Sequence, residues 1–184
     1  MQPKLELVYA APHAISRNQS GVRTSMRRQA WLASAADATE RLDATAAEKL
    51  VADAFQNARV ILFGFSGKHQ REIRHMLRSI GCMAIATGSD LRQLQDVCAM
   101  GMGFTHVFVN IDAFEDVEDA VVALMAFRSN APGMILVAFS ESVSGDDFGT
   151  ERRRICDVTL KLPVSAARLT NGMVTAFLNH ADEL

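Results

Sequence analysis

Short apolar runs alternate with helical segments through the last two-thirds of this chain of 184 residues. Each run is apolar along its whole length instead of at every second residue, which is typical of strands buried on both faces of a parallel sheet. Gly81 and Gly101 stand where two of the helical segments end, and glycine is the usual residue just after a helix. This pattern predicts strands at 60–63, 82–86, 106–109, 134–139 and 158–162, and helices at 69–80, 90–100, 116–129, 145–155 and 165–180.

The alternation of strands and helices restricts the topology. Strands joined through helices run parallel and their crossovers are right-handed, so few arrangements remain. We predict an α/β fold with a doubly wound five-stranded parallel sheet, in the order 2-1-3-4-5 that flavodoxin-like proteins share. Because ligands of such sheets bind at the carboxyl ends of the strands, the candidate site includes residues 64–68, 110–112, 140–142 and 162–163.

Residues 1–57 are interpreted as an N-terminal extension, and residues 58–184 as the sheet domain. Residues 4–9 predict a short strand, and the residues from 22 to 57 predict two helices that break near 37–43. One of these helices carries an apolar stripe that must be buried, so we expect an interaction or dimerisation arm and a homodimer. The stripe consists of Ala47, Leu50, Val51, Ala54 and Phe55.

The overall charge excludes two classes of protein. A net charge of −2 and 49% apolar residues exclude a disordered chain, and the weak charge excludes a strongly basic nucleic-acid binder. Arginines do concentrate in the extension, but no DNA-binding module accompanies them. A DNA-linked transcription regulator is therefore kept only as an alternative, and nucleic acid is not an expected partner. The arginines are Arg17, Arg23, Arg27 and Arg28.

Cysteine usage and hydropathy indicate the compartment. Cys82, Cys98 and Cys156 are widely spaced, so neither a disulfide framework nor a metal site is expected. Glu6 stands where the apolar part of a signal peptide would begin, and no apolar run is long enough to span a membrane. We expect a cytoplasmic protein without a membrane partner.

Residues 59–180 resemble the receiver domain of two-component response regulators. The first strand ends at Gly64 and Phe65, and Asn110, Ser140 and Leu162 are spaced like that family's phosphoacceptor, switch hydroxyl and invariant lysine. Pro163 matches the proline that follows this lysine. The resemblance implies a receiver fold and a role in signal transduction.

Most of the residues that perform receiver chemistry are replaced. Gly64 and Phe65 stand in place of the acidic pair, so no carboxylate is available there to bind Mg²⁺. Asn110 replaces the nucleophilic aspartate and Leu162 replaces the lysine, whereas Ser140 retains the hydroxyl. The resemblance therefore implies a pseudo-receiver that is not an enzyme, uses no cofactor and acts by protein–protein interaction independently of phosphorylation. We expect Phe65 and Leu162 to fill the former pocket.

Two neighbouring residues carry charges of the kinds that are lost. Asp112 lies two positions beyond Asn110, but without the acidic pair it would still have no metal site. Lys161 lies one position before Leu162, and alternation along a strand directs it away from the pocket. We expect neither residue to restore phosphotransfer.

Ser66, Gly67 and Lys68 form a candidate anion-binding site, because they lie between a strand and the start of a helix. The segment is not a nucleotide-binding P-loop, since His69 follows Lys68 where that motif requires Ser or Thr. The alternative is a plain strand-to-helix turn with no ligand. The alternative function is a small-ligand sensor for an anion or nucleotide, with Asn110 and Ser140 as hydrogen-bond donors.

Arg152, Arg153 and Arg154 form a basic cluster that is a candidate partner-binding site. Receiver domains signal through their fourth helix, fifth strand and fifth helix, which correspond here to about residues 144–180. The resemblance therefore favours docking of a protein partner at this cluster, and a solvated charged face is the alternative.

Overall fold

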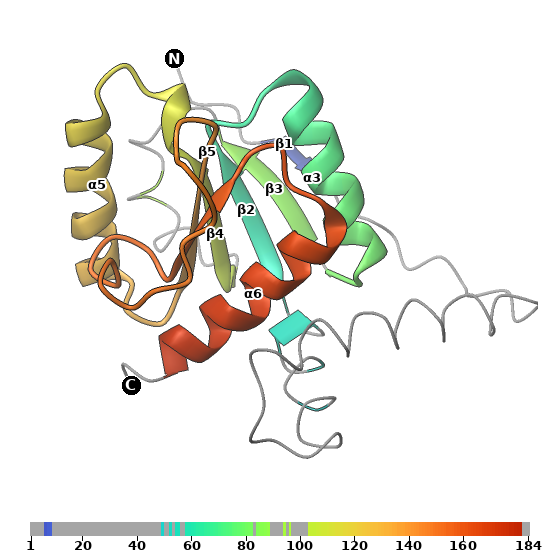
Figure 1. Ribbon diagram of the computed structural model, residues 1–184. Coiled ribbons are helices and arrows are strands. Elements are labelled where there is room, and N and C mark those ends of the chain that lie inside the picture. The colour runs from blue at the N-terminus through green and yellow to red at the C-terminus, as the bar shows by residue number, and fades with distance from the viewer. Residues whose placement is uncertain are drawn as a thin grey trace, which may run out of the picture.

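The computed structural model describes residues 6–8, 49, 52, 54–55, 58–82, 84–88, 94, 96 and 103–181. Its centre is a sheet of five parallel strands in the order β3-β2-β4-β5-β6, which is 2-1-3-4-5 when counted along the chain (Figure 1). The predicted α/β fold is thereby confirmed. The strands are β2 (Arg59–Phe63), β3 (Ala84–Gly88), β4 (His106–Asn110), β5 (Ile135–Ser140) and β6 (Val158–Lys161).

A sixth strand, β1 (Glu6–Val8), extends the sheet beyond β3. It runs antiparallel to β3, with Leu7 opposite Ala86. The short strand expected within residues 4–9 is therefore present, and it belongs to the same sheet as the parallel strands. An antiparallel strand at the edge of a parallel sheet is common in doubly wound folds.

Helices cover both faces of the sheet, as Figure 1 shows. On one face α3 (Gly67–Ser79) and α6 (Ala166–Ala181) bury Leu77 and Met173 against Phe108 and Phe139. On the other face α5 (Val117–Asn130) packs Leu124 and Phe127 onto Val107, Val109 and Leu136. Residues facing opposite sides alternate along each strand, so β2, β3, β4 and β5 contribute to both apolar layers, whereas β6 contributes Val158 and Leu160 to the first layer only.

Local sequence signals explain where these helices begin and end. The carboxylate of Asp116 accepts hydrogen bonds from the backbone N–H of Glu118 (2.8 Å) and Asp119 (3.4 Å), which caps the start of α5. Gly81, with φ of 95°, follows α3, and the N–H of Cys82 then donates to the carbonyl of Leu77 at 3.0 Å. Glycine adopts this left-handed conformation without the clash that a Cβ would cause.

The helix predicted at residues 145–155 is wrong. Asp147 instead exchanges two backbone hydrogen bonds with Thr159 of β6, at 2.8 and 2.9 Å, and residues 151–155 form turns. Two glycines, Gly145 and Gly149, lower the helix propensity, and the Asp147 side chain accepts a bond from the N–H of Gly149 at 2.9 Å. Local bonds from aspartate to the backbone compete with helix formation, so the segment lies along the edge of β6 as an irregular loop.

Most of the extension and of the helix expected at 90–100 lie outside the described residues. Where the structure describes them, Leu94 and Asp96 are helical, and so are Lys49 and Phe55. Phe55 and Ala54 are buried in the core beneath α3 and α6, so the end of the extension packs on the sheet domain. No helix in the described part of the chain combines the length and hydrophobicity that spanning a membrane requires.

Candidate functional site

The carboxyl edge of the parallel sheet holds the positions that the sequence singles out. Gly64 and Phe65 follow β2, Asn110 ends β4, Ser140 ends β5, and Leu162 with Pro163 follows β6. Because the strands are parallel, these positions meet at one edge of the sheet.

Gly64 and Asn110 join the loop after β2 to the end of β4. The side-chain amide of Asn110 donates to the carbonyl of Gly64 at 3.3 Å. Gly64 has φ of 73°, and a Cβ at this position would lie 2.7 Å from the carbonyl oxygen of Asn110. The approach therefore requires glycine. The side-chain oxygen of Asn110 is buried without a hydrogen-bond partner among the described residues.

Phe65 and Leu162 lie in the apolar core beneath this edge. Their exposed fractions are 8% and 3%, and both pack in the layer covered by α3 and α6. The ring of Phe65 meets that of Phe139 edge-on, with centroids 5.1 Å apart. Leu162 precedes Pro163 through a cis peptide bond, and its N–H donates to the carbonyl of Ser140 at 2.8 Å. Apolar side chains thus occupy both of these positions beneath the carboxyl edge.

Ser140 is linked to Asp112, a residue that the sequence suggested only as a substitute phosphoacceptor. Asp112 lies in the short 3-10 helix η1 (Ile111–Ala113) directly after β4. Its carboxylate accepts hydrogen bonds from the hydroxyl of Ser140 at 2.7 Å and from the N–H of Glu141. The hydroxyl of Ser140 in turn accepts a bond from the N–H of Ser142 at 3.0 Å. Asp112 therefore fixes the start of the loop after β5.

The placement of Asp112 was accessible in principle from the sequence. A carboxylate just past one strand and a serine at the end of the neighbouring strand are brought together by a parallel sheet. The sequence did not indicate that Ile111–Ala113 forms a 3-10 turn after β4. In this turn the Asp112 side chain does not take the direction that strand alternation would give it.

Ser66, Gly67 and Lys68, the candidate anion site, are exposed at the start of α3. Ser66 makes no side-chain capping bond. Two neighbouring side chains already face carboxylates: Lys68 lies 3.7 Å from Glu72, and His69 Nδ1 lies 3.4 Å from Glu141. These carboxylates oppose the binding of an anion at this helix end.

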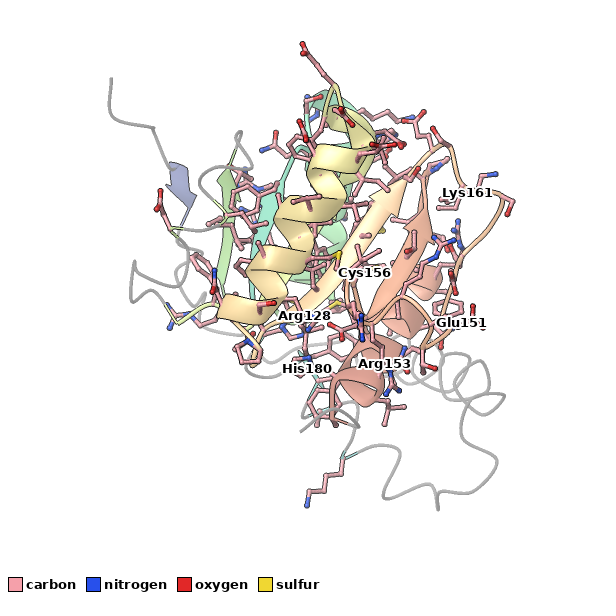
Figure 2. The ribbon with its side chains drawn as sticks, turned by 90° about the vertical axis from the view of Figure 1, so that its left-hand side faces the viewer. Arg128, Glu151, Arg153, Cys156, Lys161 and His180 are labelled. Carbon is pink, nitrogen blue, oxygen red and sulfur yellow. The ribbon has the colours of Figure 1, made fainter. Side chains whose placement is uncertain are left out.

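The three arginines lie in the loop between β5 and β6, and Lys161 is the last residue of β6. The ammonium of Lys161 donates to the carbonyl of Ser144 at 3.3 Å. Arg152 lies 3.4 Å from Asp147, and the arginines belong to turns instead of the expected fourth helix. Arg152 and Arg154 are exposed, while Arg153 is partly buried. Figure 2 places Lys161 and Arg153 toward opposite ends of β6.

A buried charged cluster that sequence reasoning missed lies at the opposite edge of the sheet (Figure 2). Asp157 has no exposed surface, and its carboxylate accepts a hydrogen bond from the N–H of Leu136 at 2.6 Å. Arg128 of α5 lies 2.8 Å from this carboxylate, and His180 of α6 lies 3.6 Å from it. The cluster therefore joins both helical layers to the start of β6.

His106, at the start of β4, is buried beside this cluster. Burial lowers its pKa to about 4, and the charge of Asp157, which raises the pKa, offsets this only in part; His180 lowers the pKa further. Its Nδ1 lies 2.8 Å from the hydroxyl of Thr105. The imidazole is therefore neutral at pH 7.

The described cysteines are buried, and the described acidic groups do not cluster with them. Cys82 and Cys156 are buried and free of disulfides, and burial raises the pKa of Cys82 to about 12. Among the described residues, no three His, Cys, Asp or Glu side chains gather closely enough to hold a metal ion.

No protein-family model matches the chain, and no curated protein gives a significant sequence match. The fold thus defines the class of protein, a doubly wound α/β domain.

Proposed function

We propose that this chain is a receiver-like regulatory protein that transmits signals by protein–protein interaction and does not undergo phosphotransfer. The observation that carries the proposal is the carboxyl edge of the sheet. There Asn110 is hydrogen-bonded to Gly64, and Phe65 and Leu162 lie in the core. An amide and two apolar side chains offer no carboxylate, either as the nucleophile or as the charged ligand with which proteins bind Mg²⁺.

Asp112 supports the same proposal, although it is a carboxylate. Its two oxygens accept bonds from Ser140 and from the N–H of Glu141, so they bind the protein's own loop. In the receiver family the corresponding hydroxyl acts as a switch. Here its hydrogen bond to Asp112 holds the loop after β5 in one arrangement without a phosphoryl group. We propose that the domain presents one constant surface to its partner.

The partner is a protein component of a signalling pathway, and we place the encounter in the cytoplasm. The buried, unpaired thiols of Cys82 and Cys156 are consistent with a reducing compartment. Arg152 and Arg154, exposed on the loop beside β6, are the proposed docking residues for an acidic surface.

Phosphorylation in vitro tests the loss of phosphotransfer. The chain is incubated with Mg²⁺ and acetyl phosphate, and its intact mass is measured; a receiver with an intact acidic pair is treated in parallel as positive control. We expect no phosphoryl adduct on the wild-type chain or on Asp112→Asn. An adduct that appears on the wild-type chain and disappears in Asp112→Asn would overturn the proposal and assign phosphotransfer to Asp112.

A second candidate function is a small-ligand sensor, because the buried oxygen of Asn110 has no partner among the described residues. A ligand that donates a hydrogen bond to this oxygen would raise the melting temperature according to RT ln(1 + [L]/Kd). Nucleotides and inorganic phosphate are the probes, and Asn110→Ala is the control. Stabilisation of the wild type alone would favour the sensor. A DNA-linked role rests on arginines outside the described residues and is left as the third alternative.

A further inference from the structure

The outer face of α5 is unusually apolar for a helix at the surface. Every large apolar side chain that is strongly exposed in the described part of the chain belongs to this helix: Val117 (50%), Val122 (65%) and Met125 (40%). Leu124 and Phe127 already bury the inner face against the sheet. A surface helix normally directs polar residues outward. An apolar outer face marks a surface that another molecule covers.

Helical spacing places Val122 and Met125 on one ridge, whereas Val117, seven positions before Leu124, lies on the side of that buried residue. Glu118, Val122, Met125 and Ser129 follow one another at intervals of four, three and four residues, so they share the side of α5 opposite Leu124. The ridge begins with a carboxylate and continues with apolar side chains. Charge and apolar character therefore follow each other along the length of this ridge.

The charge at the start of α5 is strongly negative. Four exposed carboxylates lie before and within its first turn. Asp116 is engaged in capping, and the others face solvent. They are Glu115, Asp116, Glu118 and Asp119.

The charge beside the other end of α5 is positive. The ion pair between Arg128 and Asp157 fixes the segment before β6 next to the end of α5, and Cys156 packs in the same apolar layer as Phe127. The arginine turn immediately precedes this segment, and Figure 2 shows Arg153 at the same end of the sheet as Arg128. Arg152 and Arg154 are the exposed members of this turn, and Arg154 precedes Asp157 by only three residues, so we infer positive charge beside the end of the ridge that lies opposite its carboxylates.

We propose that α5 packs antiparallel against α5 of a second copy of this chain, across a two-fold axis that passes near Val122 and Met125. A two-fold axis brings the same patch of both copies together, so the patch must complement itself. An acidic end, an apolar middle and a basic end satisfy this condition, because each acidic end then faces the partner's basic turn. The inference deepens the proposed function by naming a second copy as a partner, and it requires neither the presence nor the loss of phosphotransfer.

The oligomeric state of the full chain tests the apolar middle. We expect sedimentation velocity to show a dimer for the wild type and for Ala167→Glu, which adds a carboxylate at an exposed position of α6. Val122→Asp and Met125→Asp each place two like charges at the axis and are expected to raise the dissociation constant about tenfold or more. Circular dichroism establishes that each variant is folded. A monomeric wild type, or a dimer unaffected by both substitutions, would overturn the proposal.

Charge exchange tests the antiparallel arrangement independently of the apolar substitutions. Glu118→Arg and Arg152→Glu are each expected to weaken self-association, since like charges then meet at both ends of the interface. In an equimolar mixture of the two variants the altered ends face each other with opposite charge, so we expect a heterodimer close to wild-type strength. A mixture that remains monomeric would contradict the proposed arrangement. The mass measurement with acetyl phosphate is unaffected by these outcomes, so the two proposals fail separately.

Discussion

Gly64 lies where the loop after β2 comes close to the backbone of Asn110 at the end of β4, and this contact depends on the absence of a side chain at Gly64. Its φ of 73°, and the 2.7 Å that would separate a Cβ from the carbonyl oxygen of Asn110, both exclude a side chain. We expect Gly64→Ala to lower the free energy of unfolding by about 1–3 kcal/mol. Gly133→Ala is the matched control, because a Cβ there meets nothing within 4 Å. Chemical denaturation of both variants measures the difference, and equal stability would contradict this account of the edge.

His106 makes the stability of the fold depend on pH. Burial lowers the pKa of the folded-state imidazole to about 4, whereas its usual value is 6.5. Between these two values the unfolded chain binds a proton that the folded chain does not, so the free energy of unfolding falls as the pH falls from 6.5 to 4. The total loss from this group is about 3 kcal/mol, and it levels off below about pH 4.

Replacement of the imidazole isolates this contribution from the carboxylates that titrate in the same range. We expect His106→Gln to lose stability less steeply than the wild type between pH 6.5 and 4, in denaturation curves measured at several pH values. The imidazole faces Asp157 from the start of β6 and His180 from α6, so both side chains remain in the variant as the background. Identical slopes for the two proteins would show that His106 is protonated equally in the folded and unfolded states.

At the scale of elements, the loop between β5 and β6, where a helix was expected, is held to α6 by a partly buried ion pair between Asp146 and Arg168. The guanidinium of Arg168 in α6 donates to both oxygens of Asp146, and also to the carbonyls of Pro163 (2.9 Å) and Lys161 (2.8 Å). The N–H of Lys161 donates to Asp146 at 2.7 Å. Burial alone raises the pKa of Asp146, but the hydrogen bonds from Arg168 and Lys161 outweigh it, so this pKa lies below its usual value.

Arg168→Met is expected to lower the free energy of unfolding by about 1–2 kcal/mol, because it leaves the Asp146 carboxylate without its charged donor. The same carboxylate stabilises the wild type above about pH 4, and this contribution is lost as the pH falls through its lowered pKa. Hydrogen exchange should become faster at Asp147 and Thr159, whose backbone pairing depends on the loop position. Lys68→Met, which removes only the exposed pair with Glu72, is the control. Unchanged exchange in Arg168→Met would show that the pairing to β6 holds the loop without Arg168.

The correctly predicted elements depend on local sequence patterns, whereas the element that was predicted wrongly depends on contacts between residues distant in sequence. Apolar runs located the five parallel strands within two residues of their observed starts, and crossover rules yielded their order. The helix at 145–155 failed because Asp146 and Asp147 bind α6 and β6, which are distant in sequence. The contacts of Asp112 with Ser140 and of Asp157 with Arg128 likewise depend on which strand ends become neighbours. Residue patterns do not contain that information until a topology is assumed.

At the scale of the whole molecule, both edges of the parallel sheet are covered. The Asp147 bridge lies on β6 at one edge, and β1 pairs with β3 at the other. An uncovered edge presents unpaired N–H and C=O groups that join strands of other molecules. The pairing therefore makes the three-residue strand β1 the edge of the sheet on one side, and the Asp147 bridge covers β6 at Thr159 on the other.

Removal of residues 1–9 tests the covering at the β3 edge. We expect the amides of residues 84–88 to lose protection from hydrogen exchange, because the pairing of Leu7 with Ala86 and of its two neighbours is lost. The amides of 106–110 in the central strand β4 serve as the internal reference and should keep their protection. The full-length variant Leu7→Pro, which places proline inside β1, should reproduce the effect without shortening the chain. If residues 84–88 exchange equally slowly in all three proteins, β1 does not cover this edge, and the sheet ends at β3.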